Sequence, residues 1–188
     1  MALPHAILVS LCEQSGSGYE LTRRFDRSIG YFWSATHQQI YRTLRTMEAD
    51  GWVAATVVAQ QGRPDKKVYT VSDAGRAELA RWINGPLHAG RTGEGGVREL
   101  AVKLRGAAYG DRTALLEQVV ALRAERAKVL DTYRGFEKTQ FCDPTSLRDS
   151  ALHHYLVLRG GIRTEEGTID WLDEIAAALQ SLPHQENP

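Results

Sequence analysis

The sequence predicts a mainly α-helical protein with one small β-hairpin, built from an N-terminal mixed part and a C-terminal helical part. Capping residues and glycines delimit four short helices in the first part. Two short apolar runs with strand-like alternation lie between the third and fourth of these helices. A stretch with five glycines and one proline follows at residues 84–96, which is turn and linker chemistry. The predicted division is a domain at 1–84, a linker at 85–96 and a helical domain at 97–188.

The composition is that of an ordinary globular protein. The chain has 188 residues, 43% of them apolar and 24% charged, and its 23 basic residues balance its 23 acidic ones. No run approaches the roughly 18 apolar residues that indicate a membrane span, and the start lacks the basic region of a signal peptide. Cys12 and Cys142 lie far apart and form no CxxC pair. We therefore expect a cytoplasmic protein with no membrane partner, no disulfide framework and no zinc site.

Three of the N-terminal helices are predicted from their first turns. Pro4 suits the first turn of a helix over residues 3–13. Ser17 is a good N-cap for a second helix that reaches about residue 28, because Glu20 stands three residues later and completes a capping box. Ser72 caps the fourth helix in the same way.

The third helix has one apolar and one polar face. Ser34 or Thr36 caps it, and its apolar stripe consists of Ile40, Leu44 and Met47. The opposite face is not needed for packing, and it carries the following residues: His37, Gln38, Tyr41, Arg42 and Arg45.

A β-hairpin is predicted after the third helix. The strand-like runs at 52–59 and 67–71 are joined by a polar turn that is too long for a tight two-residue connection. We expect this turn to project Arg63, Lys66 and Lys67 away from the body of the domain.

This order of elements is that of a winged helix-turn-helix. The major groove of DNA accepts one α-helix, so the exposed face of the third helix would read base edges while the basic hairpin reaches the flanking backbone. Arg42 and Arg45 offer paired donors to guanine, and Gln38 and Gln39 suit adenine or the backbone. Hydroxyl groups near the helix starts suit phosphate oxygens. The predicted DNA-binding residues are Tyr19, Ser34, Thr36, His37, Gln38, Gln39, Tyr41, Arg42, Arg45, Arg63, Lys66 and Lys67.

Five segments of this domain carry a joint likeness. They are SGYEL (17–21), FWS (32–34), QIYRTL (39–44), MEADGWV (47–53) and GRPDKKVYTVSDAG (62–75). In this order they resemble the PadR-type transcriptional regulators, and the helical part resembles the longer C-terminal type of that family. Ala35 stands where the family often has proline, and His37-Gln38 where it often has His-Gly, so base preference is expected to differ. The resemblance implies a dimeric repressor that binds an inverted repeat in double-stranded DNA and is released by a small molecule.

The helical part is predicted to contain helices over 97–108, 112–141 and 147–182. The second has an apolar residue at every third or fourth position, which is a heptad seam interrupted by Arg126. At about 1.5 Å per residue this helix is roughly 45 Å long, and its seam would stay exposed without a partner. We expect both a homodimer and packing within the chain against the last helix, with some seam residues serving each contact. The seam residues are Leu115, Val119, Leu122, Val129, Tyr133 and Phe136.

Two features of the helical part have alternative interpretations. Arg126 either fixes the register of the seam or extends outward to water. The pair Gly160-Gly161 is expected to interrupt the last helix, as a kink or as a close approach between helices.

The sequence contains no signature of an enzyme. It has no Walker A loop, no HExxH motif and no GxSxG motif. His153 and His154 are adjacent, so on a helix they point about 100° apart and do not share a metal ion. We predict no catalytic residue, no metal and no cofactor.

A regulatory ligand completes the sequence-based hypothesis. Aromatic and imidazole side chains of the helical part suit a small, flat aromatic effector, which we expect to touch at least one of His154, Tyr155 and Trp171. Two other functions stay open: a constitutive or architectural DNA-binding protein without an effector, and a winged helix that binds proteins. Protection of an inverted repeat, smeared protection and no protection would distinguish the three.

Overall fold

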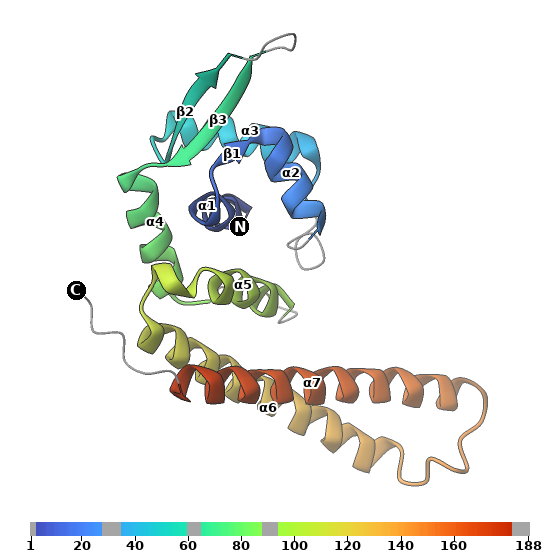
Figure 1. Cartoon of the computed structure of the whole chain (residues 1–188). Helices are drawn as coiled ribbons and strands as arrows, with labels where there is room; N and C mark the ends of the chain where they lie inside the picture. The colour runs from blue at the N-terminus through green and yellow to red at the C-terminus, as the bar shows by residue number, and fades with distance from the viewer. Residues whose placement is uncertain (1–2, 28–34, 60–64, 88–93, 182–188) are drawn as a thin grey trace. The chain divides into compact units, whose positions relative to one another are not determined.

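The computed structural model describes residues 3–27, 35–59, 65–87 and 94–181 (Figure 1). By its internal contacts the chain divides into two compact units, Met1–Leu115 and Leu116–Pro188. The described part is mostly helical, with a small three-stranded antiparallel sheet in the first unit. The predicted fold class is thereby confirmed. None of the described helices is long and apolar enough to cross a membrane.

The elements follow the predicted order closely. Those of the first unit are α1 (Leu3–Glu13), β1 (Gly16–Ser17), α2 (Gly18–Arg27), α3 (His37–Ala49), β2 (Val53–Val58), β3 (Lys66–Val71), α4 (Asp73–Asn84), α5 (Glu94–Arg105) and the short 3-10 helix η2 (Ala107–Tyr109). After them, α6 (Arg112–Gln140) leads into the second unit and α7 (Asp149–Ser181) completes it.

Local hydrogen bonds set the starts of α2 and α4. The amide of Glu20 donates to Ser17 Oγ at 3.3 Å, and the carboxylate of Glu20 accepts from the amide of Ser17 at 2.8 Å. Ser72 Oγ accepts from the amide of Gly75 at 3.1 Å. Each contact pairs an otherwise orphaned amide with a side chain three residues away, so both predicted caps are confirmed.

The core of the first unit is built around α1, which packs against α2, α3, α4, α5 and β3 (Figure 1). Residues 6–9 of α1 are fully buried. They belong to one apolar cluster that every neighbouring element joins. The other buried members of this cluster are Leu11, Leu21, Phe25, Ile40, Leu44, Met47, Val53, Tyr69, Leu79, Trp82, Ile83 and Val102.

The sheet has a strand that the sequence pattern did not predict. Its order is β1-β3-β2, and β1 pairs Gly16 with Tyr69 and Ser17 with Val68. Two residues are too few for an alternation signal, so only the pairing with β3 reveals this strand. The predicted hairpin is confirmed as β2 and β3, and we call this pair the wing. The turn at 60–64, including Arg63, lies outside the described residues.

The helix that follows the glycine-rich segment packs with the first unit. Val102 is 4% exposed in the core, and Arg105 makes a two-pronged ion pair with Glu13, with both distances 2.8 Å. The ammonium of Lys103 lies 5.2 Å from the ring centre of Trp82. The contact-based division therefore falls at Leu115, whereas composition placed the linker at 85–96. Residues 88–93 of that linker lie outside the described part.

In the second unit, α6 and α7 form an antiparallel hairpin (Figure 1). The expected interruption at Gly160-Gly161 is wrong, because α7 runs through both glycines. A Cβ at Gly161 would lie only 3.0 Å from Tyr133 Cε2, while one at Gly160 would meet nothing within 4 Å. Close approach of α6 at Gly161 is therefore the explanation that fits, and tertiary packing offsets the low helix propensity of glycine.

Arg126 does not extend outward to water. The residue is 6% exposed, and its guanidinium lies 3.6 Å from Oε1 of Glu165 on α7 and 3.1 Å from Oε1 of Glu125. Its Nε and the second oxygen of Glu165 are buried without a hydrogen-bond partner among the described residues. The charged pair therefore joins α6 to α7 at a fixed register.

Candidate nucleic-acid interface

The start of α3 is built from a second reciprocal cap. Thr36 Oγ1 accepts from the amide of Gln39 at 3.2 Å, and Gln39 Oε1 accepts from the amide of Thr36 at 2.9 Å. Of the two caps expected for α3 the structure uses Thr36, and Ser34 lies outside the described residues. Because Gln39 Oε1 is engaged in the cap, only its NH2 group remains for an external acceptor.

The two faces of α3 differ as the sequence predicted. Ile40, Leu44 and Met47 are at most 1% exposed and point into the core of the first unit. The opposite face is exposed along its whole length, and it consists of His37, Gln38, Tyr41, Arg42 and Arg45, together with Gln39. This face, which we call the polar face of α3, carries donors and acceptors outside the apolar core of the first unit.

Tyr41 fixes the polar face against the start of α2. A Cβ at Gly18 would overlap Cε1 of the Tyr41 ring, so only glycine allows the ring to lie on this backbone. Tyr41 is 42% exposed in this position, and the neighbouring Tyr19 is 61% exposed. Two aromatic hydroxyl groups therefore lie at the surface where α2 and α3 meet.

A surface hollow of about 870 Å³ lies between α2, α3 and β3. Five basic residues line it: Arg23, Arg24, Arg45, Lys66 and Lys67. Sequence reasoning missed Arg23, although it stands four residues after Tyr19 and thus on the same face of α2. Arg24 has a structural role, since its guanidinium donates to the carbonyls of Ser10 and Gln14 at the end of α1.

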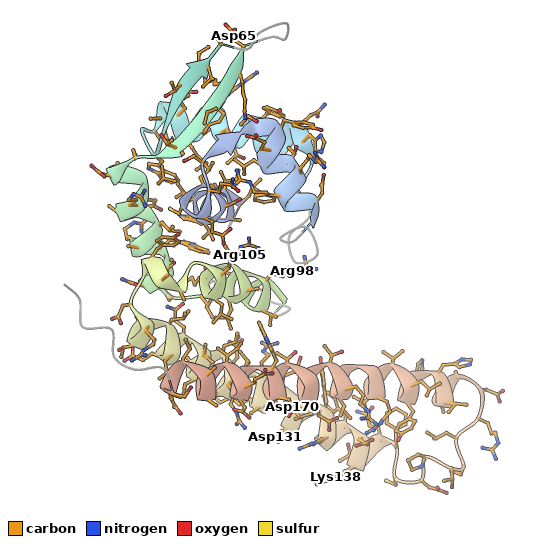
Figure 2. The ribbon with its side chains drawn as sticks, in the orientation of Figure 1. Asp65, Arg98, Arg105, Asp131, Lys138 and Asp170 are labelled. Atoms are coloured by element: carbon orange, nitrogen blue, oxygen red, sulfur yellow. The ribbon has the colours of Figure 1, made fainter. Side chains whose placement is uncertain are left out.

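The two lysines of the wing are placed differently from the expectation. They are the first residues of β3 and not part of a projecting turn. Lys66 Nζ lies 2.7 Å from Oε1 of Glu20, and Lys67 Nζ lies 2.7 Å from Oε2 of Glu48. The expectation that the turn projects these two lysines away from the domain is therefore wrong. Each lysine instead forms an ion pair with an acid on α2 or α3. Asp65, which precedes them, marks the described end of the wing (Figure 2).

One member of each ion pair has a shifted pKa. The hydrogen bond from Lys66 and that from the Ser17 amide lower the pKa of Glu20 to about 2. The hydrogen bond with Glu48 raises the pKa of Lys67. Glu20 and Lys67 therefore stay charged at neutral pH, and each lies beside a group of opposite charge.

The predicted seam of α6 changes character along the helix. Leu115, Val119 and Leu122 are at most 4% exposed within the single chain. Val129 and Tyr133 are half-buried, and Tyr133 packs beside a cluster of Leu130, Ile162 and Ile169. Phe136 is 44% exposed. The described apolar side chains that stay most exposed in the second unit are Val120, Phe136, Leu156 and Val157.

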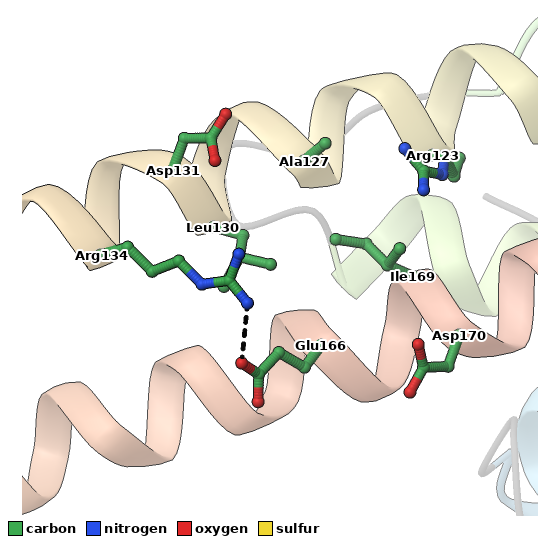
Figure 3. Close-up of a pocket in the computed structure, with 8 residues that line it drawn as sticks. All are labelled: Arg123, Ala127, Leu130, Asp131, Arg134, Glu166, Ile169 and Asp170. Atoms are coloured by element: carbon green, nitrogen blue, oxygen red, sulfur yellow. Dashed lines mark hydrogen bonds and ion pairs between the residues drawn. The ribbon is translucent and has the colours of Figure 1, made fainter.

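Charged pairs border a groove of about 300 Å³ between α6 and α7 (Figure 3). Arg134 Nη2 lies 3.1 Å from Oε1 of Glu166 at one end. Arg123 lines the other end and makes a two-pronged hydrogen bond with Asp173, at 2.9 and 3.1 Å. These contacts cross between the two helices and hold them in register at the surface.

The three residues expected to touch an effector lie in two separate places on α7. His154 is exposed, and the hydroxyl of half-buried Tyr155 lies 3.4 Å from Oε1 of Glu137. Trp171 is also half-buried, but it stands 16 residues further along the helix. At about 1.5 Å per residue the two places are roughly 24 Å apart, so one small molecule bound to one chain cannot touch both.

Two family models cover most of the chain. Residues 7–81 match the model described as the transcriptional regulator PadR-like family. Residues 98–180 match the model described as virulence activator alpha C-term. The first match covers the elements that carry the polar face of α3 and the wing, and the second covers α5 to α7 almost completely.

Individual relatives match over nearly the full length. The chain is 70% identical over 186 residues to the probable transcriptional regulator Rv1176c of Mycobacterium tuberculosis, covering 96% of this chain and 98% of that protein. It is 29% identical over 178 residues to the negative transcriptional regulator PadR of Bacillus subtilis, covering 94% and 97%. Among solved structures, Bacillus subtilis PadR in complex with operator DNA matches with 28% identity, a TM-score of 0.47 and coverage of 95% and 99%.

Proposed function

The chain belongs to the PadR-like family of transcriptional regulators, and from this premise we propose that it is a dimeric repressor, bound to an inverted-repeat operator and released by a small aromatic molecule. That it is a transcriptional regulator with a DNA-binding fold, and not an enzyme, follows from the family itself. The repressor role is supported by the Bacillus subtilis relative, which is named a negative regulator. We further propose that it acts in the cytoplasm, as its cysteine usage led us to expect.

The polar face of α3 is the observation that carries this proposal. An exposed helix face with two arginines, three amide or imidazole side chains and a tyrosine has no role in the core. A helix of this kind fits the major groove, where paired donors of arginine read guanine and amides read adenine. The adjacent wing suits the flanking backbone.

We assign roles on this face from the geometry. Arg42 and Arg45 are proposed to contact base edges, and His37 and Gln38 stand at the helix start, which enters the groove first. Gln39 holds the helix cap and offers its NH2 group to a backbone oxygen. The hydroxyls of Tyr19, Thr36 and Tyr41 suit phosphate oxygens. Ser34 and Arg63, which lie outside the described residues, complete the proposed contacts. Lys66 and Lys67 belong to the interface as the first residues of β3 in the wing.

The dimer is supported by the apolar side chains that the hairpin of α6 and α7 leaves uncovered. Phe136, Leu156 and Val157 are 44%, 56% and 77% exposed, and exposed apolar groups on helices favour a protein partner. A second copy is the partner expected from the seam of α6. Two copies would present two copies of α3, spaced about 34 Å apart to match one turn of DNA.

The effector is proposed to bind at one of the two places on α7 described above. Tyr155 with the neighbouring His154 provides an aromatic ring and a polar anchor, and Trp171 provides a larger ring. Candidate aromatic acids should release the protein from DNA. If the effector binds beside Tyr155, His154→Ala and Tyr155→Ala should each weaken release. If it binds at Trp171, only Trp171→Ala should weaken release. Unchanged release in all three folded variants would reject both places.

DNA binding is tested by selecting duplexes from a randomised pool with the full-length protein and footprinting the enriched sequence. We expect protection of an inverted repeat. Arg42→Ala should weaken binding to that duplex by about 1–3 kcal/mol and leave binding to unrelated duplex nearly unchanged. Arg76→Ala, an exposed arginine on α4, is the matched control and should bind normally. Smeared protection would indicate an architectural protein, and no protection would indicate a protein-binding winged helix.

A further inference from the structure

Two adjacent lysines at the start of β3 are each held by an acid from a different helix. Successive side chains of a strand point to opposite faces, so Lys66 and Lys67 leave β3 in opposite directions. Lys66 meets Glu20 of α2, and Lys67 meets Glu48 of α3, each at 2.7 Å. The wing is therefore tied at its described end to both helices that border the hollow.

Glu20 is the point where three elements of the first unit meet. Its carboxylate accepts from Lys66 Nζ at 2.7 Å, from the amide of Ser17 at 2.8 Å and from Ser17 Oγ at 3.1 Å. Ser17 belongs to β1, where it pairs with Val68 of β3. One carboxylate at the start of α2 thus binds the first residue of β3 and the strand that pairs with it.

Glu48 makes the corresponding contact from the last turn of α3. Its partner Lys67 also lies over the ring of Tyr69, with the ammonium 5.5 Å from the ring centre. Tyr69 is 5% exposed and belongs to the core. The second ion pair therefore links the end of α3 to the part of β3 that is fixed by packing.

A lysine that is already paired gains little from a phosphate. Replacing a carboxylate by a phosphate exchanges one charge-assisted hydrogen bond for another and leaves the acid unpaired beside the polyanion. Lys66 and Lys67 are only 30% and 46% exposed in these pairs. Arg23 is exposed and lines the hollow. It carries no ion pair among those the structure records for the described residues, and is better placed to bind phosphate.

We propose that Glu20 and Glu48 are positioning residues, which hold the wing at a fixed angle to α2 and α3 through Lys66 and Lys67, and that these ion pairs persist in the DNA complex. This inference rests on the proposed DNA-binding function. In the complex the two lysines act by setting where the wing meets DNA, and the phosphate contacts come from other residues.

The test measures binding of the full-length protein to its selected duplex and to an unrelated duplex at several salt concentrations. Glu20→Gln keeps an acceptor for the helix cap but removes the charge, and Lys66→Gln removes the other partner. Each should lower affinity for the selected duplex roughly 5- to 30-fold, and the double variant should be no weaker than either single one. The slope of affinity against salt should not change. Glu48→Gln and Lys67→Gln should behave in the same way.

Direct phosphate contacts would give a different pattern. Lys66→Gln would then reduce the slope of affinity against salt by the amount expected for the loss of about one phosphate contact. Glu20→Gln would strengthen binding, because it removes a negative charge from the DNA-facing surface. Either result overturns the inference. Glu13→Gln is the matched control, since Glu13 is paired with Arg105 of α5 outside the hollow, and it should bind as the wild type does.

A measurement without DNA separates this inference from the proposed function. Hydrogen exchange of the β3 amides should be several-fold faster in Glu20→Gln and in Lys66→Gln than in the wild type and in Glu13→Gln. Unchanged exchange in both variants would overturn the positioning role. If the wild-type protein enriches no duplex from the pool, the proposed function fails, and the exchange data still decide whether the ion pairs hold the wing.

Discussion

The two compact units of the chain are each stabilised by a different kind of interior. The first unit surrounds α1 with other elements, and sixteen buried side chains among its described residues form one apolar cluster. In the second unit, a cluster of Leu130, Ile162 and Ile169 lies between two helices that are also joined by charged pairs. A two-helix hairpin has no further element to cover its outer faces. We therefore predict that the first unit is stable as a single copy, and that the second needs the partner surface of the proposed dimer.

The largest expected effect comes from separating the units. A fragment of residues 1–115 should stay folded and monomeric, and its affinity for the selected duplex should fall by about 10²- to 10⁴-fold, because the two half-sites are no longer linked. Sedimentation and duplex titration measure both properties. A stable dimer of this fragment at micromolar concentration would contradict the assignment of dimerisation to the helical unit.

A shorter fragment sharpens the same comparison. Residues 1–96 lack Val102 and Arg105, which pack on α1 or pair with Glu13. This fragment should unfold at lower denaturant concentration than 1–115, because it loses a buried apolar side chain and its surroundings. Equal midpoints would place the stability boundary at the glycine-rich linker, as the composition predicts.

The second prediction concerns the buried charged pair of the helical unit. Arg126→Met should destabilise the protein by about 3–5 kcal/mol, because Glu165 is left buried without its partner. Removing both charges in Arg126→Met with Glu165→Leu should recover most of this loss. Denaturant unfolding of the full-length protein measures both variants. The exposed pair is the control, and Arg134→Met should cost about 1 kcal/mol or less. Equal losses in the two single variants would show that burial is not what distinguishes them.

A third, smaller effect is expected at the start of α3. Thr36→Ala removes the hydroxyl that accepts from the amide of Gln39, and the expected cost is about 1 kcal/mol. The loss should appear as faster hydrogen exchange in the first turn of α3 and a lower unfolding midpoint. Thr46→Ala, in the exposed last part of the same helix, serves as the control and should cost less. An equal loss of stability at both positions would show that the Thr36 cap has no special role in stabilising this helix.

The smallest effect is a pH dependence within the first unit. The ring of His5 stacks on Trp82 at 4.3 Å, and its Nε2 lies 2.9 Å from Oε1 of Glu78. Burial lowers the pKa of His5 below its ordinary value of 6.5, against the opposing effect of Glu78. The unfolded chain therefore binds this proton first, so stability is complete above about pH 6.5 and falls as the pH drops toward the lowered value. Urea midpoints across this window should fall less in His5→Gln, and identical profiles would refute the assignment.

Sequence alone determined the elements whose signals lie within a few residues. The caps at Ser17, Thr36 and Ser72 depend on a partner three positions away, so they can be predicted without knowledge of the fold. The polar face of α3 follows from the spacing of Ile40 and Leu44, since residues three or four apart share a helix side. The order of helices and wing, and with it the winged helix-turn-helix, could be predicted for the same reason.

The tertiary structure decided whatever depends on residues far apart in the chain. Strand β1 exists because Gly16 and Ser17 pair with β3, and α7 continues through Gly161 because Tyr133 packs there. Arg126 is buried because Glu165 faces it across the hairpin. None of these partners stands near its counterpart in sequence, so no local pattern could reveal them.

The candidate DNA surface combines both kinds of information. The sequence determined which residues α3 exposes, because helical periodicity fixes the direction of each side chain. Only the fold decided that Lys66 pairs with Glu20 and Lys67 with Glu48. It also decided that Arg24 donates to a carbonyl at the end of α1, while Arg23 lines the hollow. The physical reason is that the interaction between two charged side chains depends on their distance in space. That distance is set only once the core has folded.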